Sequence, residues 1–185
     1  LIVGAKRMVD AVRLSGQDVF YEYRSKEIAE YLIAHPEYTK VVVALSGDVG
    51  FYSGAKKLAE LLGPDTEMIC GISSVVYFMS RIGLSWDDAK IVSAHGKTCN
   101  LISLIRTNRK VFAILGTGDG VRKLAEKLTF YGMGDVILHV GENLSYDNEK
   151  ILAKPARDFV SYEGDPLSVI CAYNPGAEPE LATHG

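Results

Sequence analysis

Two kinds of segment alternate along the chain: short apolar runs, and stretches whose apolar residues recur at helical spacing. Residues Lys40–Leu45 (KVVVAL) form an almost continuous apolar run, which is typical of a strand buried on both faces. Apolar positions in Ser53–Leu62 recur every three or four residues, which predicts an amphipathic helix. The same order returns at Lys110–Leu115 (KVFAIL), followed by a glycine-rich turn and a predicted helix over Val121–Tyr131.

Weaker segments of the same two kinds complete this pattern. The first three residues predict the end of a strand that enters a helix, and further strands and helices are predicted at 67–70, 73–82, 90–93, 99–106, 135–140 and 167–173. Strands that alternate with helices indicate βαβ units and a mainly parallel sheet. The predicted fold class is therefore α/β, in two domains that cover residues 1–96 and 97–185.

Composition and charge narrow the class of protein. The chain has 185 residues and a formal net charge of -3, so no global basic field favours nucleic acid or a membrane surface. Its apolar runs are shorter than a bilayer span, and no signal peptide is visible. The three cysteines lack CxxC and Cys/His spacings, which disfavours a disulfide scaffold and a zinc site. These observations predict a cytoplasmic globular protein that ligates no metal.

Ligands of open α/β sheets bind beyond the carboxyl ends of strands, so the loops that follow strands are the places to look for chemistry. The loop after KVVVAL contains Gly47 and Asp48. Glycine lets the backbone approach a ligand closely, and the Asp48 carboxylate is suited to accept from a ribose hydroxyl or an amino group. A tight turn capped by the same aspartate is an equally open interpretation.

Two further loops carry polar side chains at strand ends. Ser73 and Ser74 stand at a strand-to-helix junction, where hydroxyl groups either cap the helix or face a ligand. His95, in the loop Ala94–Lys97, is a candidate acid–base group, although a lone histidine in a loop is more often structural or merely solvated.

The glycine-rich turn Gly116–Gly120 suggests phosphate binding. A dinucleotide fingerprint requires a further glycine where Val121 stands, so a dinucleotide site is disfavoured and a phosphate-binding turn stays open. The next strand leads into another polar, glycine-led loop over Gly141–Tyr146. The sequence contains no GxSxG elbow, Walker loop or HExxH motif, so these loops are suited to holding a small molecule by backbone contacts.

Taken together and in order, these loops resemble the tetrapyrrole methylase family, and within it most closely the branch that methylates C5 of precorrin-6Y. The resemblance rests on VGAKR, SGDVGFYS, GISSVVYFMSRIG with SWDDAKIVSAHGK, VFAILGTGDG and GENLSYDNEKI, which span almost the whole chain. It implies two α/β/α domains with S-adenosyl-L-methionine (SAM) folded into the cleft between them, usually in a homodimer.

The resemblance also implies roles for individual residues. Contacts to SAM would come from Gly47, Asp48, Phe51, Tyr52, Ser73, Ser74, Leu115, Gly116, Asn143 and Leu144. His95 and Lys97 match a His-Gly-basic motif of this branch and would face the tetrapyrrole, and His95 is the candidate for a catalytic base. Because such a substrate carries many carboxylates, Arg81 and Arg106 are further candidates for substrate binding, with solvated surface charge as the alternative for each.

Three features depart from the family pattern. Members begin with a strand and a GxGPG-like loop ahead of VGAKR, and both are expected to be missing here. Val49 stands where proline usually follows Gly-Asp. Lys97 often corresponds to arginine, so a point charge replaces a bidentate fork.

The expected function is SAM-dependent methylation of C5 in a precorrin or cobalt-precorrin during cobalamin biosynthesis, with S-adenosyl-L-homocysteine as product. A separate decarboxylating C15-methyltransferase is the expected functional partner. The alternatives are a methylase of the same superfamily that acts on another precorrin position, on diphthine or on ribosomal RNA, a dinucleotide-dependent reductase, and a non-catalytic tetrapyrrole-binding protein. Affinity for SAM would separate methylases from the last two classes.

Overall fold

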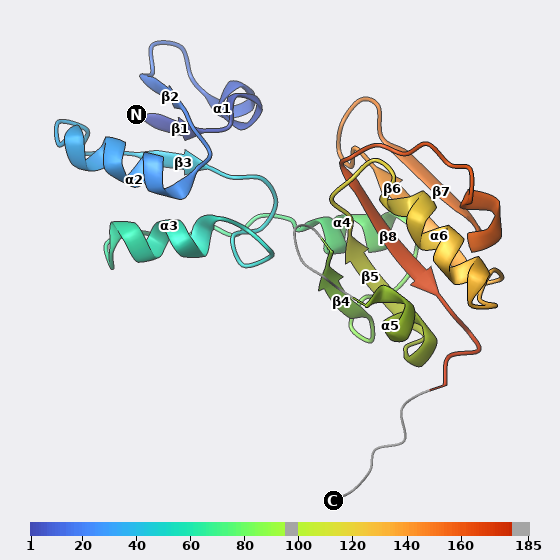
Figure 1. Cartoon of the computed structure of the whole chain (residues 1–185). Helices are drawn as coiled ribbons and strands as arrows, with labels where there is room; N and C mark the ends of the chain where they lie inside the picture. The colour runs from blue at the N-terminus through green and yellow to red at the C-terminus, as the bar shows by residue number, and fades with distance from the viewer. Residues whose placement is uncertain (95–99, 179–185) are drawn as a thin grey trace, which may run out of the picture. The chain divides into compact units, whose positions relative to one another are not determined.

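The computed structural model describes residues 1–94 and 100–178, which form two compact units, Leu1–Ser73 and Ser74–Gly185 (Figure 1). The predicted domain boundary at residues 96 and 97 lies outside the described residues and stays a prediction. The compact units divide earlier in the chain, because the strand that begins at Lys90 pairs with the strand of the KVFAIL run. No helix among the described residues is long and apolar enough to cross a membrane.

The first unit contains a small parallel sheet and helices on both of its faces. Its elements are β1 (Ile2–Gly4), α1 (Lys6–Val12), β2 (Val19–Tyr21), α2 (Ser25–Ala34), β3 (Val42–Ala44) and α3 (Ala55–Leu62). Within residues 1–94 the sheet has the order β2-β1-β3, and both neighbours of β1 run parallel to it.

Side chains alternate between the two faces of β1. Val3 packs with Ile28 of α2 and Leu58 of α3 in a small core. On the other face, Gly4 lies against Val9 of α1: a Cβ at Gly4 would lie 3.3 Å from Val9 Cγ2 and 2.5 Å from the carbonyl oxygen of Ala44. Only glycine therefore fits between α1 and the sheet at this position.

The second unit is built on a larger, mixed sheet. Its elements are α4 (Ser74–Arg81), β4 (Lys90–Ser93), α5 (Leu101–Thr107), β5 (Lys110–Ile114), α6 (Gly120–Phe130), β6 (Ile137–Glu142), β7 (Lys150–Pro155), the 3-10 helix η1 (Ala156–Phe159) and β8 (Ser168–Tyr173). In the described part of the unit the strand order is β4-β5-β8-β6-β7. β4 and β5 are parallel, whereas β8 runs antiparallel to β5 and β6, and β7 antiparallel to β6.

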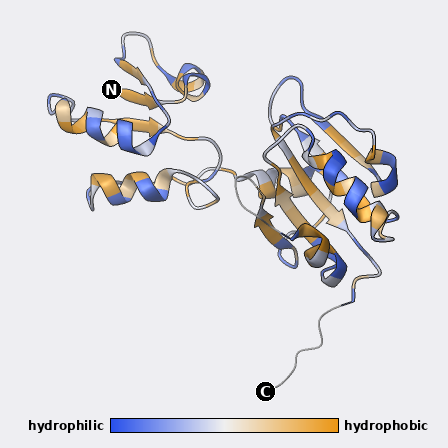
Figure 2. Ribbon diagram, in the orientation of Figure 1, coloured by the Kyte–Doolittle hydropathy of each residue, from blue (hydrophilic) through white to orange (hydrophobic). Residues whose placement is uncertain are grey.

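Helices cover both faces of this sheet. Val111 belongs to a core that also contains Ile105 of α5 and Leu128 of α6, and all three are fully buried. Phe112, one residue further along β5, faces the opposite side and meets Phe78 of α4 with ring centroids 6.3 Å apart. Figure 2 shows the strands of this sheet as largely hydrophobic, in contrast to the alternating polar and apolar surface of α6.

Three expectations from the sequence are corrected. The run Lys40–Leu45 becomes an edge strand, β3, with Val42 61% exposed, because it pairs with β1 alone among the described strands. Residues 67–70 form no strand: Ile69 is 77% exposed, and no described strand pairs with this segment. The sheet of the second unit is mainly antiparallel, because β8 returns between β5 and β6.

Candidate functional site

Asp48 organises the loop that follows β3. Its Oδ1 accepts the N–H of Gly50 at 2.8 Å, and its Oδ2 accepts the N–H of Gly71 at 3.1 Å. A Cβ at Gly71 would lie 2.3 Å from the carbonyl oxygen of Gly47, so only glycine fits at Gly71. The structure thus brings the predicted loop of Gly47 and Asp48 against the segment that leads to Ser73, and the carboxylate caps the turn between them.

Phe51 and Tyr52 extend the same loop with two aromatic rings. Their ring centroids lie 4.9 Å apart in an edge-on arrangement. Tyr52 has φ +49° and is 55% exposed. A non-glycine residue held in this region costs on the order of 1–3 kcal/mol, and such residues cluster at ligand sites. Ser73, in contrast, is buried.

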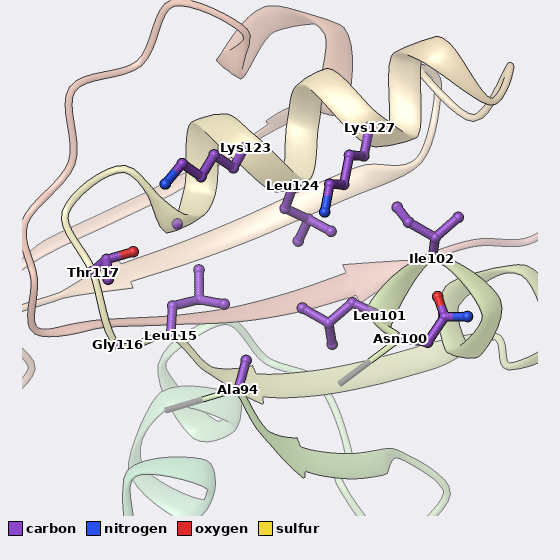
Figure 3. Close-up of a pocket in the computed structure, with 11 residues that line it drawn as sticks. Ala94, Asn100, Leu101, Ile102, Leu115, Gly116, Thr117, Lys123, Leu124 and Lys127 are labelled. Atoms are coloured by element: carbon purple, nitrogen blue, oxygen red, sulfur yellow. The ribbon is translucent and has the colours of Figure 1, made fainter. Parts of the chain in front are cut away.

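In the second unit, Leu115 and Gly116 line a cavity of about 540 Å³ beside α5 and α6 (Figure 3). Its wall is mainly apolar and carries two cations; the lining residues are Ala94, Asn100, Leu101, Ile102, Leu115, Gly116, Thr117, Gly120, Lys123, Leu124 and Lys127. Figure 3 shows the Lys123 ammonium group directed toward Thr117 and that of Lys127 beside Leu124. Lys123 also pairs with Asp119 at 2.5 Å. The cavity therefore combines an apolar wall with positive charge.

The backbones of Asn143 and Leu115 form hydrogen bonds to two neighbouring residues where β8 begins. The N–H of Asn143 donates to the carbonyl oxygen of Leu167 at 3.0 Å, and the N–H of Leu115 donates to that of Ser168 at 3.0 Å. Leu144 packs close to Gly141, where a Cβ would lie 2.9 Å from Leu144 Cδ2. The structure therefore brings the predicted loops after β5 and β6 to one edge of the sheet.

A polar cluster beside Asn143, around the buried Glu142, was not predicted from the sequence. Glu142 is 1% exposed, and its Oε1 accepts the N–H of Asp165 at 2.8 Å. Asn143 Nδ2 donates to Asp165 Oδ2 at 3.0 Å and holds the pKa of that carboxyl below its usual value. Burial, with a hydrogen bond to Glu142, raises the pKa of Tyr162 to about 12. The one available signal was a glutamate at the end of the apolar run ILHVGE.

The two predicted substrate-binding arginines that the structure describes, Arg81 and Arg106, do not line the cavity of Leu115. Arg81 Nη2 pairs with Glu149 Oε1 at 3.1 Å. Arg106 lines a different cavity of about 450 Å³ near Asn174. His95 and Lys97 lie outside the described residues. The roles of all four in substrate binding stay predictions.

Among the residues that the structure describes, no group of three or more His, Cys, Asp or Glu side chains is placed to hold a metal ion. The polar atoms of the strand-end loops are mainly backbone amides and carbonyls, with the carboxylate of Asp48 and the amide of Asn143 engaged within the protein. Such a set can bind a small organic molecule, but it supplies no evident nucleophile.

A family model described as Tetrapyrrole (Corrin/Porphyrin) Methylases matches residues 6–160. The chain belongs to the tetrapyrrole methylase family. It is 33% identical over 112 residues to the cobalt-precorrin-7 C(5)-methyltransferase of Salmonella typhimurium, a match that covers 60% of this chain and 55% of that protein. It is 29% identical over 182 residues to the probable cobalt-precorrin-7 C(5)-methyltransferase of Methanocaldococcus jannaschii, covering 94% of this chain and 84% of the relative.

Solved structures of this tetrapyrrole methylase fold are similar to the chain over most of its length. The precorrin-6Y methylase CbiE of Archaeoglobus fulgidus matches with a TM-score of 0.65 at 18% identity, covering 98% of this chain and 85% of that one. The uroporphyrin-III C-methyltransferase of Thermus thermophilus, solved with S-adenosyl homocysteine, matches with a TM-score of 0.70 at 18% identity over 93% and 79% of the two chains. At these identities the likeness establishes the fold.

Proposed function

We propose that this tetrapyrrole methylase transfers a methyl group from SAM to C5 of a precorrin or cobalt-precorrin. The structural observation that carries the proposal is the end of the sheet at which the N–H groups of Asn143 and Leu115 donate to the carbonyl oxygens of Leu167 and Ser168, where β8 begins. The names of the Salmonella and Methanocaldococcus relatives supply the reaction and the class of substrate. The match covers 55% of the Salmonella protein, so the reaction and the substrate of this chain are part of the proposal.

Each unit, taken by itself, offers groups that are suited to contacts with SAM. Apolar atoms around Leu115 suit an adenosine moiety, and backbone groups after β5 and β6 suit its polar edges. In the first unit, Asp48 fixes the backbone of the Gly47 loop, so these groups need little reorganisation on binding. SAM, when bound, supplies an electrophilic methyl group on a sulfonium, so the protein needs no nucleophile of its own.

The chain's contribution to the reaction is then mainly positioning and exclusion of water. Holding two reactants in line contributes up to roughly 7–11 kcal/mol to lowering a barrier in favourable cases. A bound SAM would supply the methyl group to the ring carbon and would leave as S-adenosyl-L-homocysteine, and a base would take up the proton that this carbon loses. His95 is the predicted base.

Homodimer assembly, a cytoplasmic location and a separate decarboxylating C15-methyltransferase as partner also stay proposals. A related precorrin-6Y C(5,15)-methyltransferase [decarboxylating] of Sinorhizobium supports the last of these: 140 residues match at 31% identity, which covers 75% of this chain and 34% of that protein.

Calorimetric titration with S-adenosyl-L-homocysteine, with NADH as control, tests the proposal. We expect saturable binding of the homocysteine compound and none of NADH. The opposite result would favour the dinucleotide-dependent reductase, and binding of neither would exclude both. Mass spectrometry and ¹³C NMR of a precorrin incubated with methyl-labelled SAM then distinguish C5 from the other ring positions.

A further inference from the structure

One carboxylate, that of Glu149, ties the loop after β6 to α4. Its Oε2 accepts the backbone N–H of Ser145 at 2.8 Å and the hydroxyl of Tyr77 at 2.7 Å. Its Oε1 pairs with the Arg81 guanidinium at 3.1 Å. The Glu149 side chain is 13% exposed, whereas that of Arg81 is 55% exposed. The hydrogen bond from Tyr77 is partly buried, whereas that from Ser145 lies at the surface.

The loop needs such support because its backbone is strained. Asn143 has φ +49° and Ser145 has φ +69°, and neither residue is glycine. A residue in this left-handed region costs roughly 1–2 kcal/mol relative to the ordinary helical region. Contacts elsewhere must stabilise the strained conformation for it to persist.

The bond to Ser145 acts on the residue beside it. The N–H of Ser145 belongs to the peptide group that also contains the Leu144 carbonyl. Because a peptide group is planar, holding the N–H fixes the direction of the carbonyl. Leu144 and Asn143 are the residues of this loop that are predicted to contact SAM.

The charge state of Glu149 is consistent with this arrangement. The Ser145 N–H and the Tyr77 hydroxyl, with Arg81 nearby, hold the pKa of Glu149 below its ordinary value. An ionised carboxylate accepts from both donors at neutral pH, and hydrogen bonds to charged groups are stronger than neutral ones.

We propose that Glu149 is a positioning residue for cofactor binding, which holds the Leu144–Ser145 peptide in its binding orientation through Tyr77 on α4. The inference rests on the proposed function, because SAM is the molecule that the peptide would meet. It gives Arg81, predicted to bind substrate, a second role as the exposed partner of the same carboxylate.

The test measures the dissociation constant of S-adenosyl-L-homocysteine by calorimetry for Glu149→Gln and Tyr77→Phe. Both substitutions keep the shape of the side chain. We expect Glu149→Gln to weaken binding about tenfold, because it removes the charge of the group that accepts both hydrogen bonds, and Tyr77→Phe about threefold, because it removes one of the two donors. In turnover, the KM for SAM should rise while kcat at saturating SAM is largely kept.

Leu128→Ala serves as the matched control for destabilisation alone. Leu128 is fully buried on α6 and does not line the cavity of Leu115. This variant should lower the melting temperature and leave the dissociation constant of the folded protein unchanged. Tyr77→Phe keeps the test available if Glu149→Gln does not fold.

The outcomes separate this inference from the proposed function. If the unsubstituted protein binds S-adenosyl-L-homocysteine and both variants bind it equally tightly, the positioning role is wrong and the proposed function stands. Equal weakening by Leu128→Ala would also overturn the positioning role. Absence of binding by the unsubstituted protein would overturn the proposed function and this inference together.

Discussion

The two units differ in how much apolar surface their folds bury. In the part of the first unit that the structure describes, three strands of three residues carry a small core around Val3, Ile28 and Leu58. In the described part of the second unit, strands of four to six residues pack with α5, α6 and η1 around a larger core that includes Val111, Leu128 and Phe159. Burial scales with unit size, so small units are harder to stabilise. The second unit therefore buries more apolar surface than the first, and we expect it to be the more stable of the two.

Truncation of a central aromatic side chain in the second unit should give the largest loss of stability. Phe112→Ala removes a fully buried ring that packs against Phe78, and should lower the free energy of unfolding of the second unit by about 3–5 kcal/mol. Hydrogen exchange followed by mass spectrometry should show the loss of protection in residues 74–178. An equal loss of protection in residues 1–73 would show that the two units unfold as one.

A methyl group at Gly71 should destabilise the first unit, which hydrogen exchange followed by mass spectrometry would also detect. Gly71→Ala places a Cβ 2.3 Å from the Gly47 carbonyl oxygen, so the loop of Asp48 must shift. We expect a stability loss of about 1–3 kcal/mol, as for other overpacked sites, and weaker binding of S-adenosyl-L-homocysteine. Gly63→Ala is the control. Its backbone, with φ +89°, is also unfavourable for alanine, but the new Cβ would have no atom within 4 Å. Equal effects of the two variants on binding would contradict the role of the Gly47–Gly71 contact.

We expect the stability of the second unit to fall at alkaline pH, because of the polar cluster that contains Glu142 and Tyr162. The pKa of Tyr162 in the folded state, about 12, lies above its ordinary value near 10, because burial and Glu142 disfavour the phenolate. Its contribution to stability is therefore fully present below pH 10 and is lost as the pH rises through about 12. Ultraviolet titration of tyrosinate should show a late-titrating group that is missing in Tyr162→Phe. An unchanged titration curve in the variant would rule out this assignment.

The smallest predicted effect is a difference in reactivity between one cysteine of each unit. Cys70, in the first unit, is exposed, whereas Cys171 on β8 is buried and burial raises its pKa to about 11. In a Cys99→Ser background, a thiol reagent should label one cysteine quickly at neutral pH and the other only after denaturation, because the thiolate is the reactive form. Peptide mapping should assign the fast site to Cys70. Rapid labelling of Cys171 would show that β8 opens easily.

Local pattern predicted much of the second unit correctly. The helix expected over Val121–Tyr131 is α6, with both boundaries shifted by one residue, and the run Lys110–Leu115 is β5, which ends one residue earlier. Both segments have strong periodicity and end at glycine-containing turns, which are signals carried within a few residues. The elements β2, α2 and β7 were not predicted. The two strands are short or mixed in polarity and depend on pairing with a neighbouring strand.

The candidate site was predictable only in part. Ordered motifs identified the loops of Asp48, Leu115 and Asn143, and the family match confirmed the resemblance that they suggested. The partners that hold these loops were not foreseen: Gly71 binds Asp48 across 23 positions, and Tyr77 reaches Glu149 across 72. No spacing rule relates residues so far apart in the chain.

The sequence by itself determined the family, the glycine-rich strand-end loops and the helices and strands with clear periodicity, because each of these is recorded in neighbouring residues. The tertiary structure alone decided that β8 lies between β5 and β6 and that the buried Glu142 meets the half-buried Tyr162 and Asp165. It also decided that Glu149 supports the loop of Leu144. Strand order and buried polar contacts depend on which distant segments exclude water together, and that choice is made by the packing of the whole unit.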